Sequence, residues 1–239
     1  MRERRQIERE FGVPIPGQIV DRAQWSQTAV KMLPQTGPLS WSDLYGRQAP
    51  IVMDLGCGNG RYLLGSAVWR PDHDHVGVDV LPLVIRYATR RGNQRGLTNL
   101  RFVVCEAATF LGRFVPEGSV AEIHCYHPQP YYDPRDVERR LITPEFLFLV
   151  HRALSEQGHF FLQTDNPGYW NYIRKIIPYF FRFEERTRPW PDAPKGRTRR
   201  EIIALRRGLS VFRGYGTALT GLDRVSMREL AKRLPPSDL

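Results

Sequence analysis

The chain contains few cysteines and no long apolar run. Its 239 residues include three cysteines, Cys57, Cys105 and Cys125, with no spacing typical of a metal site. We interpret them as buried thiols of a reducing compartment, which favours the cytoplasm, and we expect no bound metal. No stretch approaches the 18 apolar residues of a membrane-spanning helix. The charged start at residues 1–5 leads into no apolar segment, which argues against a secretory signal.

Acidic residues are also scarce, with 25 against 35 lysines and arginines and a formal net charge of +10. This excess favours a polyanionic partner, because lysine and arginine displace counterions from phosphates. A solvated basic surface is the alternative. Many of the arginines lie in one C-terminal region with aromatic residues between them, a composition suited to stacking and phosphate contact. This region contains Arg186, Arg188, Lys195, Arg197, Arg199, Arg200, Arg206, Arg207 and Arg213, with Tyr179, Trp190 and Phe212.

The most informative motif follows an apolar run at residues 51–53. Asp54 ends this run, and Gly56, Gly58 and Gly60 follow at alternate positions before a helical pattern. A buried strand, a glycine turn and a helix start together form a site for a phosphate or nucleoside. The GxGxG spacing differs from the dinucleotide fingerprint and from the Walker loop. It therefore favours S-adenosylmethionine over NAD or ATP as the cofactor.

A second acidic residue supports this interpretation. Asp79 ends another short apolar run, nineteen residues after Gly60. At that offset, a carboxylate is placed to accept hydrogen bonds from the two ribose hydroxyls of a nucleoside. The alternative is that Asp79 caps the helix that begins near Pro82.

The order of predicted elements indicates an α/β fold. We interpret residues 1–45 as an N-terminal extension with one short helix, and residues 46–239 as a single domain. Strands are expected near 50–54, 75–79, 100–105, 120–126, 158–164, 181–186 and 209–214, and helices near 59–69, 82–95, 143–155 and 167–177. Strands alternating with helices predict a mainly parallel sheet. Residues 187–200 show no periodicity and are expected to form a loop.

Two of these helices carry clear end signals in the sequence. Thr143 and Pro144 suit the start of one helix, and Gly158 is expected to follow its end. Pro178 is expected to stop the helix that starts at Gly168.

Ligands of such sheets bind at the carboxyl ends of the strands. Besides Asp54 and Asp79, the polar residues expected there are Glu106, the residues after Cys125, and Asp165. Glu106 is a candidate for contact with an adenine edge, or else a surface helix start. Asp165 precedes an Asn-Pro pair, so helix capping is its alternative role.

Residues 51–216 resemble the bacterial tRNA (guanine-N7)-methyltransferases, which methylate a guanine of the tRNA variable loop. The similarity rests on four motifs in the family's order: the 54–60 glycine loop with Gly77–Val80 and Asn99–Arg101, the run Arg139–Leu147, the pair Thr164–Asp165, and the segment Gly196–Glu201. The resemblance implies a Rossmann-like class I methyltransferase with a mainly parallel seven-stranded sheet and helices on both faces. It also implies S-adenosylmethionine as cofactor and tRNA as partner, in a monomer or homodimer.

The resemblance also implies roles for individual residues. Asp54, Asp79 and Glu106 would contact the cofactor together with the loop glycines. Asp165 and the segment that matches the family's Thr-Lys-Phe-Glu motif would bind the guanine or its neighbours. This segment consists of Thr198, Arg199, Arg200 and Glu201.

The chain departs from the family at the acceptor side. The family's Phe-Pro-Asp-Pro-Trp-Pro-Lys motif corresponds to residues 127–133, where Gln129 replaces the carboxylate assigned to catalysis. Asp133 replaces a substrate-contacting lysine, and Arg200 replaces an aromatic residue. His127 opens this segment, either as a group acting near neutral pH or as a hydrogen-bonded structural residue.

These residues lead to three hypotheses on function. The first is methylation of guanine N7 in tRNA, with Gln129 at the catalytic position. The second is a methyltransferase that acts on another nucleobase or on a small molecule. The third is a non-catalytic RNA-binding relative that keeps the fold.

Overall fold

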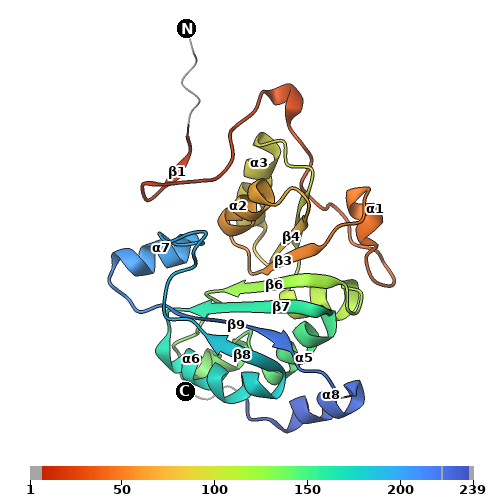
Figure 1. Ribbon diagram of the computed structural model, residues 1–239, viewed down its shortest axis with the longest axis vertical. Helices are drawn as coiled ribbons and strands as arrows, with labels where there is room; N and C mark the ends of the chain where they lie inside the picture. Colours follow the sequence, from red (N-terminus) through yellow and green to blue (C-terminus); the bar gives the residue numbers. More distant parts are fainter. Residues whose placement is uncertain (1–6, 222, 237–239) are drawn as a thin grey trace.

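A computed structural model describes residues 7–221 and 223–236 of the chain (Figure 1). Its centre is a seven-stranded sheet in the order β5-β4-β3-β6-β7-β9-β8. The first five of these strands are parallel, and β9 runs antiparallel to both of its neighbours. The strands are β3 (Ile51–Leu55), β4 (Asp74–Asp79), β5 (Leu100–Val104), β6 (Val120–Tyr126), β7 (Leu154–Thr164), β8 (Phe181–Glu185) and β9 (Phe212–Ala218).

Helices pack on both faces of this sheet, as expected for the fold class. On one face, α2 and α3 contact β4 and β5, and on the other α5 and α6 contact β7 while α8 packs on α5. These helices are α2 (Arg61–Trp69), α3 (Pro82–Gln94), α5 (Pro144–Ala153), α6 (Pro167–Ile176) and α8 (Arg224–Arg233). Shorter elements are α4 (Ala107–Thr109), the π-helical turn η2 (Phe110–Phe114), and the 3-10 turns η3 (Pro134–Arg139) and η4 (Ile177–Tyr179).

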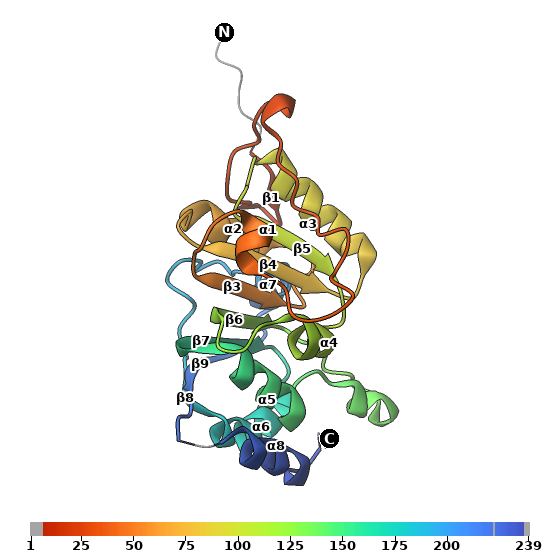
Figure 2. The same cartoon turned by 90° about the vertical axis from the view of Figure 1, so that its right-hand side faces the viewer.

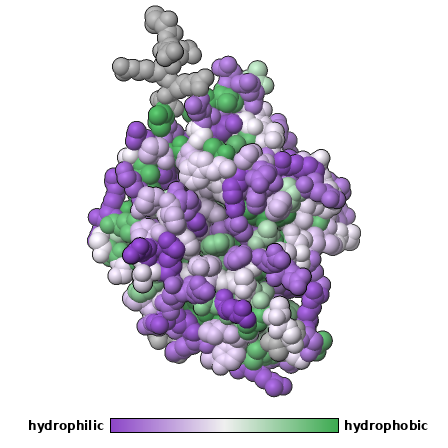
Figure 3. Space-filling view, viewed as in Figure 1, coloured by the Kyte–Doolittle hydropathy of each residue, from purple (hydrophilic) through white to green (hydrophobic). Residues whose placement is uncertain are grey.

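One half of the sheet has a face on which α2 reaches only β6, where Tyr62 contacts His124. Figures 1 and 2 show α5, α6 and α8 on one side of β7, β9 and β8, with loop segments on the other. His124, Phe161 and Tyr215 form a row across this face, and the adjacent ring pairs are stacked, with centroids 4.5 and 5.9 Å apart. Figure 3 shows this side of the molecule as mainly hydrophilic, with scattered hydrophobic residues.

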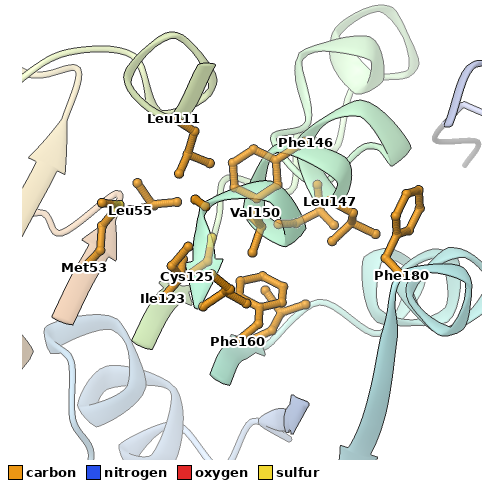
Figure 4. Close-up of a cluster of buried hydrophobic side chains, with 14 of the residues drawn as sticks. Met53, Leu55, Leu111, Ile123, Cys125, Phe146, Leu147, Val150, Phe160 and Phe180 are labelled. Atoms are coloured by element: carbon orange, nitrogen blue, oxygen red, sulfur yellow. The ribbon is translucent and has the colours of Figure 1, made fainter. Parts of the chain in front are cut away.

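The main hydrophobic core lies between the sheet and α5, α6 and α8. Ile123, Cys125, Phe160 and other apolar side chains of the central strands point into it and are fully buried. Figure 4 shows Phe146, among the residues that α5 contributes, close to the strand residues. Burial of each such side chain contributes about 1.5–3 kcal/mol, so this face anchors the sheet.

The N-terminal segment crosses the helices of the other face. It forms a hairpin of β1 (Arg9–Glu10) and β2 (Val13–Pro14), a 3-10 turn η1 (Arg22–Gln24) and the short helix α1 (Trp41–Tyr45). Glu8 bonds to Arg91 of α3 and to Arg95 just after this helix, and Glu10 bonds to Arg61 and Arg91. These ion pairs connect the hairpin to α2 and α3. The expected domain boundary near residue 45 stays a prediction.

Two helices begin where their cap residues predict. The Thr143 hydroxyl accepts a hydrogen bond from Phe146 N at the start of α5, and the Asn166 side chain accepts one from Tyr169 N at the start of α6. Asn166, and not Asp165, therefore caps α6, which excludes the capping alternative for Asp165. The last turn of α6 passes into η4, which contains Pro178.

Other predicted boundaries were wrong. Gly158 does not follow a helix end, because α5 ends at Ala153 and Gly158 lies inside β7. The register of β6 and β7 shifts here, and a Cβ on Gly158 would lie 2.9 Å from Ser155 O. Residues 187–200 form a loop up to Thr198, after which α7 (Arg199–Arg206) begins.

Candidate active site

The glycine loop lies at the carboxyl ends of the central strands, between β3 and α2. Gly56, Gly58 and Gly60 all have positive φ angles, of 75°, 52° and 73°. A Cβ on Gly60 would lie 2.8 Å from the Phe102 ring, so this glycine allows the helix to pack on the sheet. Nothing lies within 4 Å of a Cβ built on Gly56 or Gly58. These two positions leave open space over the backbone, as a bound ligand requires.

Asp79 fixes this loop from the neighbouring strand. Its Oδ2 accepts a hydrogen bond from Gly58 N and its Oδ1 accepts one from Leu81 N, both at 2.9 Å. The bond to Leu81 N does not cap α3, because Leu81 is itself the N-cap residue and no side chain caps this helix, so the capping alternative was wrong. A carboxylate has about four lone-pair sites, so both oxygens keep capacity for ribose hydroxyls.

Asp54 is buried beneath the loop at the end of β3. Burial, together with the nearby Asp79 carboxylate, raises the pKa of Asp54 to about 8, although Arg197 acts to lower it. The carboxyl group lines a cavity and forms no ion pair with the described residues. A cationic ligand in this cavity would therefore stabilise the ionised form.

Glu106 caps a helix in the structure. It is exposed, and its carboxylate accepts hydrogen bonds from Ala108 N at 2.8 Å and Thr109 N at 2.6 Å. Partial burial acts to raise the pKa of Glu106, but these backbone bonds lower it below the ordinary value. The helix-start alternative is confirmed, and the contact with an adenine edge stays a prediction.

The glycine loop and the start of α7 line the same cavity, which has a volume of about 360 Å³. This volume falls in the range of small-molecule sites. The glycine loop forms one wall, and the start of α7 forms the opposite wall. The lining residues are Asp54, Gly56, Cys57, Gly58, Asn59, Arg61, Tyr62, Val84, Tyr126, His127, Thr198, Arg199, Arg200 and Ile203.

The segment after Thr198 forms the N-terminus of α7. The Thr198 hydroxyl accepts a hydrogen bond from Glu201 N, and the Glu201 carboxylate accepts one from Arg197 N. Glu201 has no exposed surface, and its Oε1 lies 2.7 Å from Nη2 of Arg213. Glu201 therefore anchors the helix from inside, and its predicted contact with substrate has no open path in this conformation. Arg199 and Arg200 are exposed and line the cavity.

Asp165 lies behind the cavity wall. Its Oδ1 accepts a hydrogen bond from His127 Nδ1 at 3.0 Å, and its Oδ2 lies 2.7 Å from Nη2 of Arg200. Burial acts to raise the pKa of Asp165, but these two partners hold it well below the ordinary value. The structure thus joins three sequence candidates, Asp165, His127 and Arg200, although only the latter two line the cavity.

The two residues that depart most from the family lie outside the cavity lining. Gln129 is exposed, and Asp133 begins the turn η3. The Asp133 carboxylate accepts hydrogen bonds from Arg135, which lower its pKa. Their predicted roles in catalysis and substrate binding stay predictions.

The basic and aromatic residues of the 186–213 region are partly used inside the protein. Trp190 is buried, and the Arg197 guanidinium lies over its ring, 4.3 Å from the centroid. Arg197 also lies over Tyr62 and Tyr126 and pairs with Asp192 at 2.6 Å. Trp190 and Arg197 thus hold the loop in place and are not free for RNA. The mixture of arginine and aromatic residues was visible in the sequence, but not their pairing.

The strand order and the glycine loop at its switch point define a class I, S-adenosylmethionine-dependent methyltransferase. A family model described as "Putative methyltransferase" matches residues 48–213. The solved structure of the 16S rRNA methyltransferase KamB has the same fold, with a TM-score of 0.57 and 15% identity over 80% of this chain and 98% of that one.

Sequence relatives narrow the assignment. A tRNA (guanine-N(7)-)-methyltransferase of Halorhodospira halophila is 31% identical over 78% of this chain and 82% of its own length. That of Nitrosococcus oceani is 30% identical over 74% of this chain and 75% of its own length. The chain belongs to the tRNA (guanine-N7)-methyltransferase family. It spans less of some relatives, 62% of the length of the one from Saccharophagus degradans and 47% of the one from Paenarthrobacter aurescens.

The residues described by the structure contain no group of three or more metal-binding side chains. Within the same part of the chain, no helix is both long and apolar enough to cross a membrane.

Proposed function

We propose that the protein transfers a methyl group from S-adenosylmethionine to N7 of a guanine in tRNA. The observation that carries this proposal is the single cavity that joins the glycine loop to the start of α7. The similarity to tRNA (guanine-N7)-methyltransferases supports a tRNA guanine as the acceptor. The basic surface of the chain, with a formal charge of +10, suits an RNA partner.

The residues that would bind the cofactor suit the charges that it carries. When bound, S-adenosylmethionine supplies a methyl group on a positively charged sulfur. Asp79 would accept hydrogen bonds from the ribose hydroxyls. Gly56 and Gly58 leave the backbone open to the ligand. Asp54 would carry its negative charge beneath the cationic amino acid end, which offsets its burial.

The reaction asks little acid–base chemistry of the protein. Guanine N7 carries a lone pair and no proton, so no residue would have to remove a proton from N7 for it to accept the methyl group. The cavity walls would act by holding N7 in line with the methyl group, and orientation can supply much of the rate enhancement.

Two alternatives remain as outcomes of a test. One is another nucleobase or a small molecule as acceptor, and the other is RNA binding without catalysis. His127 gives no support to an acceptor that must lose a proton, because both of its ring nitrogens are already hydrogen-bonded.

The deciding experiment is methyl transfer to bulk tRNA, with the products separated as nucleosides by mass spectrometry. We expect 7-methylguanosine with the wild-type protein and none with Asp79→Ala. Another methylated nucleoside would support the first alternative. Cofactor and tRNA binding without any methylated product would support the second.

A further inference from the structure

Five side chains form one continuous hydrogen-bonded chain beside the cavity. Trp190 Nε1 lies 2.7 Å from Gln163 Oε1, and Gln163 Nε2 lies 2.8 Å from His127 Nε2. His127 Nδ1 lies 3.0 Å from Asp165 Oδ1, and Asp165 Oδ2 lies 2.7 Å from Arg200 Nη2. The chain thus runs from a buried indole to a guanidinium that lines the cavity.

The direction of every bond in this chain is determined from its first member. An indole N–H can only donate, so Gln163 must present its oxygen to Trp190 and its amino group to His127. His127 Nε2 therefore accepts, and its Nδ1–H donates to the Asp165 carboxylate. His127 is held as one neutral tautomer with both nitrogens occupied. It is a positioning residue, and its backbone φ of 53° lies in the left-handed region.

The exposure of the side chains decreases from Arg200 to His127. The Arg200 side chain is 46% exposed, whereas those of Asp165 and His127 are 8% and 4% exposed. Asp165 holds one end of the guanidinium, and the described residues offer no other partner for the rest of it. Arg200 therefore presents oriented, unoccupied N–H donors to the cavity.

Fixed donors at this place discriminate between purines. The group next to N7 is the O6 acceptor in guanine and the N6 amino donor in adenine. An arginine beside the acceptor base would bind O6 and repel an amino group. We infer that Arg200, oriented by Asp165 and His127, selects guanine through O6; this rests on the proposed function.

The test is a double-mutant cycle between Arg200 and the base. The acceptor position is first mapped with wild-type protein, and tRNA is then assembled with guanosine or 2-aminopurine there. The latter keeps N7 and the 2-amino group but lacks O6. We expect 2-aminopurine to lower kcat/KM about 10–100-fold more for wild type than for Arg200→Met, because a hydrogen bond from a charged group is lost only in the first case. Loss of the N1 proton in 2-aminopurine affects both proteins alike and cancels in the cycle.

Arg207→Met is the matched control, since Arg207 is an exposed arginine at the end of the same helix. It should weaken tRNA binding without changing the penalty for 2-aminopurine. Equal penalties in wild type and Arg200→Met would overturn the inference and leave the proposed function intact. A wild-type protein that forms no 7-methylguanosine would overturn both.

The positioning role of His127 has its own readout. His127→Phe cannot donate a hydrogen bond to Asp165. The factor by which 2-aminopurine lowers kcat/KM should therefore be at least 5-fold smaller for His127→Phe than for wild type, and closer to the factor for Arg200→Met. His127→Asn retains an N–H donor and should restore most of it. A merely structural residue would change the melting temperature and leave the base discrimination unchanged, and that result would refute the role.

Discussion

Glu201 and Arg213 form an ion pair in which both side chains are buried, with 0% and 3% exposure and 2.7 Å between Oε1 and Nη2. The same carboxylate accepts a hydrogen bond from Arg197 N. The Glu201 carboxylate thus connects β9, which contains Arg213, to α7, the helix that forms one wall of the cavity.

Glu201→Gln should destabilise the protein strongly, because Arg213 would then be buried without a counter-charge. Loss of one partner of a buried pair costs about 3–5 kcal/mol in the free energy of unfolding. Chemical denaturation measures this change. The exposed Glu184→Gln, which loses one bond to Tyr215, is the control and should cost less than about 1 kcal/mol. A loss below that level for Glu201→Gln would show that the pair is not important for stability.

The contribution of Asp54 to the free energy of unfolding should fall as the pH rises from about 4 to 8. The unfolded chain loses this proton near its ordinary pKa of 3.8, whereas the folded protein keeps it up to about 8. The folded state therefore binds more protons in this window and is destabilised as the pH rises. Asp54→Asn should raise the free energy of unfolding at pH 8 by a few kcal/mol, since one pKa unit is about 1.4 kcal/mol. At pH 4 the variant and wild type should be nearly equal, and an equal gain at both values would contradict the assignment.

Binding of S-adenosylmethionine should release a proton at pH 7. Asp54 is mostly protonated in the free protein, and a cationic ligand beside it would lower its pKa. Calorimetry in buffers of different ionisation enthalpy measures the released fraction, which we expect to approach one proton. Asp54→Asn should bind more weakly and show no dependence on the buffer. The same absence in wild type would place the cationic end away from Asp54.

The N-terminal hairpin should contribute to cofactor affinity through one of its two glutamates. Glu10 accepts a hydrogen bond from Asn59 in the glycine loop and pairs with Arg61. Among the described residues, the Glu8 carboxylate pairs only with Arg91 of α3 and with Arg95, which follows the end of that helix. We expect Glu10→Gln to raise the Kd for S-adenosylmethionine about 3–10-fold, the effect of one modest polar contact. Glu8→Gln, which removes the same charge, should leave it within 2-fold; equal effects would assign the change to charge alone.

Restoring the family's carboxylate with Gln129→Asp should change kcat on tRNA less than 3-fold. Gln129 is exposed and does not line the cavity, and a proton-free N7 requires no base. Single-turnover methylation of tRNA provides the measurement. A gain of 10-fold or more would return position 129 to the reaction centre.

The sequence predicted the turn between β3 and α2 because the signals for this turn are local. An acid at a strand end and glycines at alternate positions determine the turn between β3 and α2 with few long-range contacts. The start of α7 was missed although Thr198 and Glu201 have the spacing of a capping box, because arginines mask its periodicity. The link from Trp190 to Gln163 could not be predicted, since it depends on how a loop folds back across the sheet.

That link has a consequence for how the acceptor side evolved. His127, Gln163 and Trp190 each satisfy a polar group of the next, so replacing any one alone leaves a buried donor or acceptor unpaired. Such a group costs about 1–3 kcal/mol. We therefore expect the trio to be inherited as a unit. Homologues are expected to carry all three residues together or none of them.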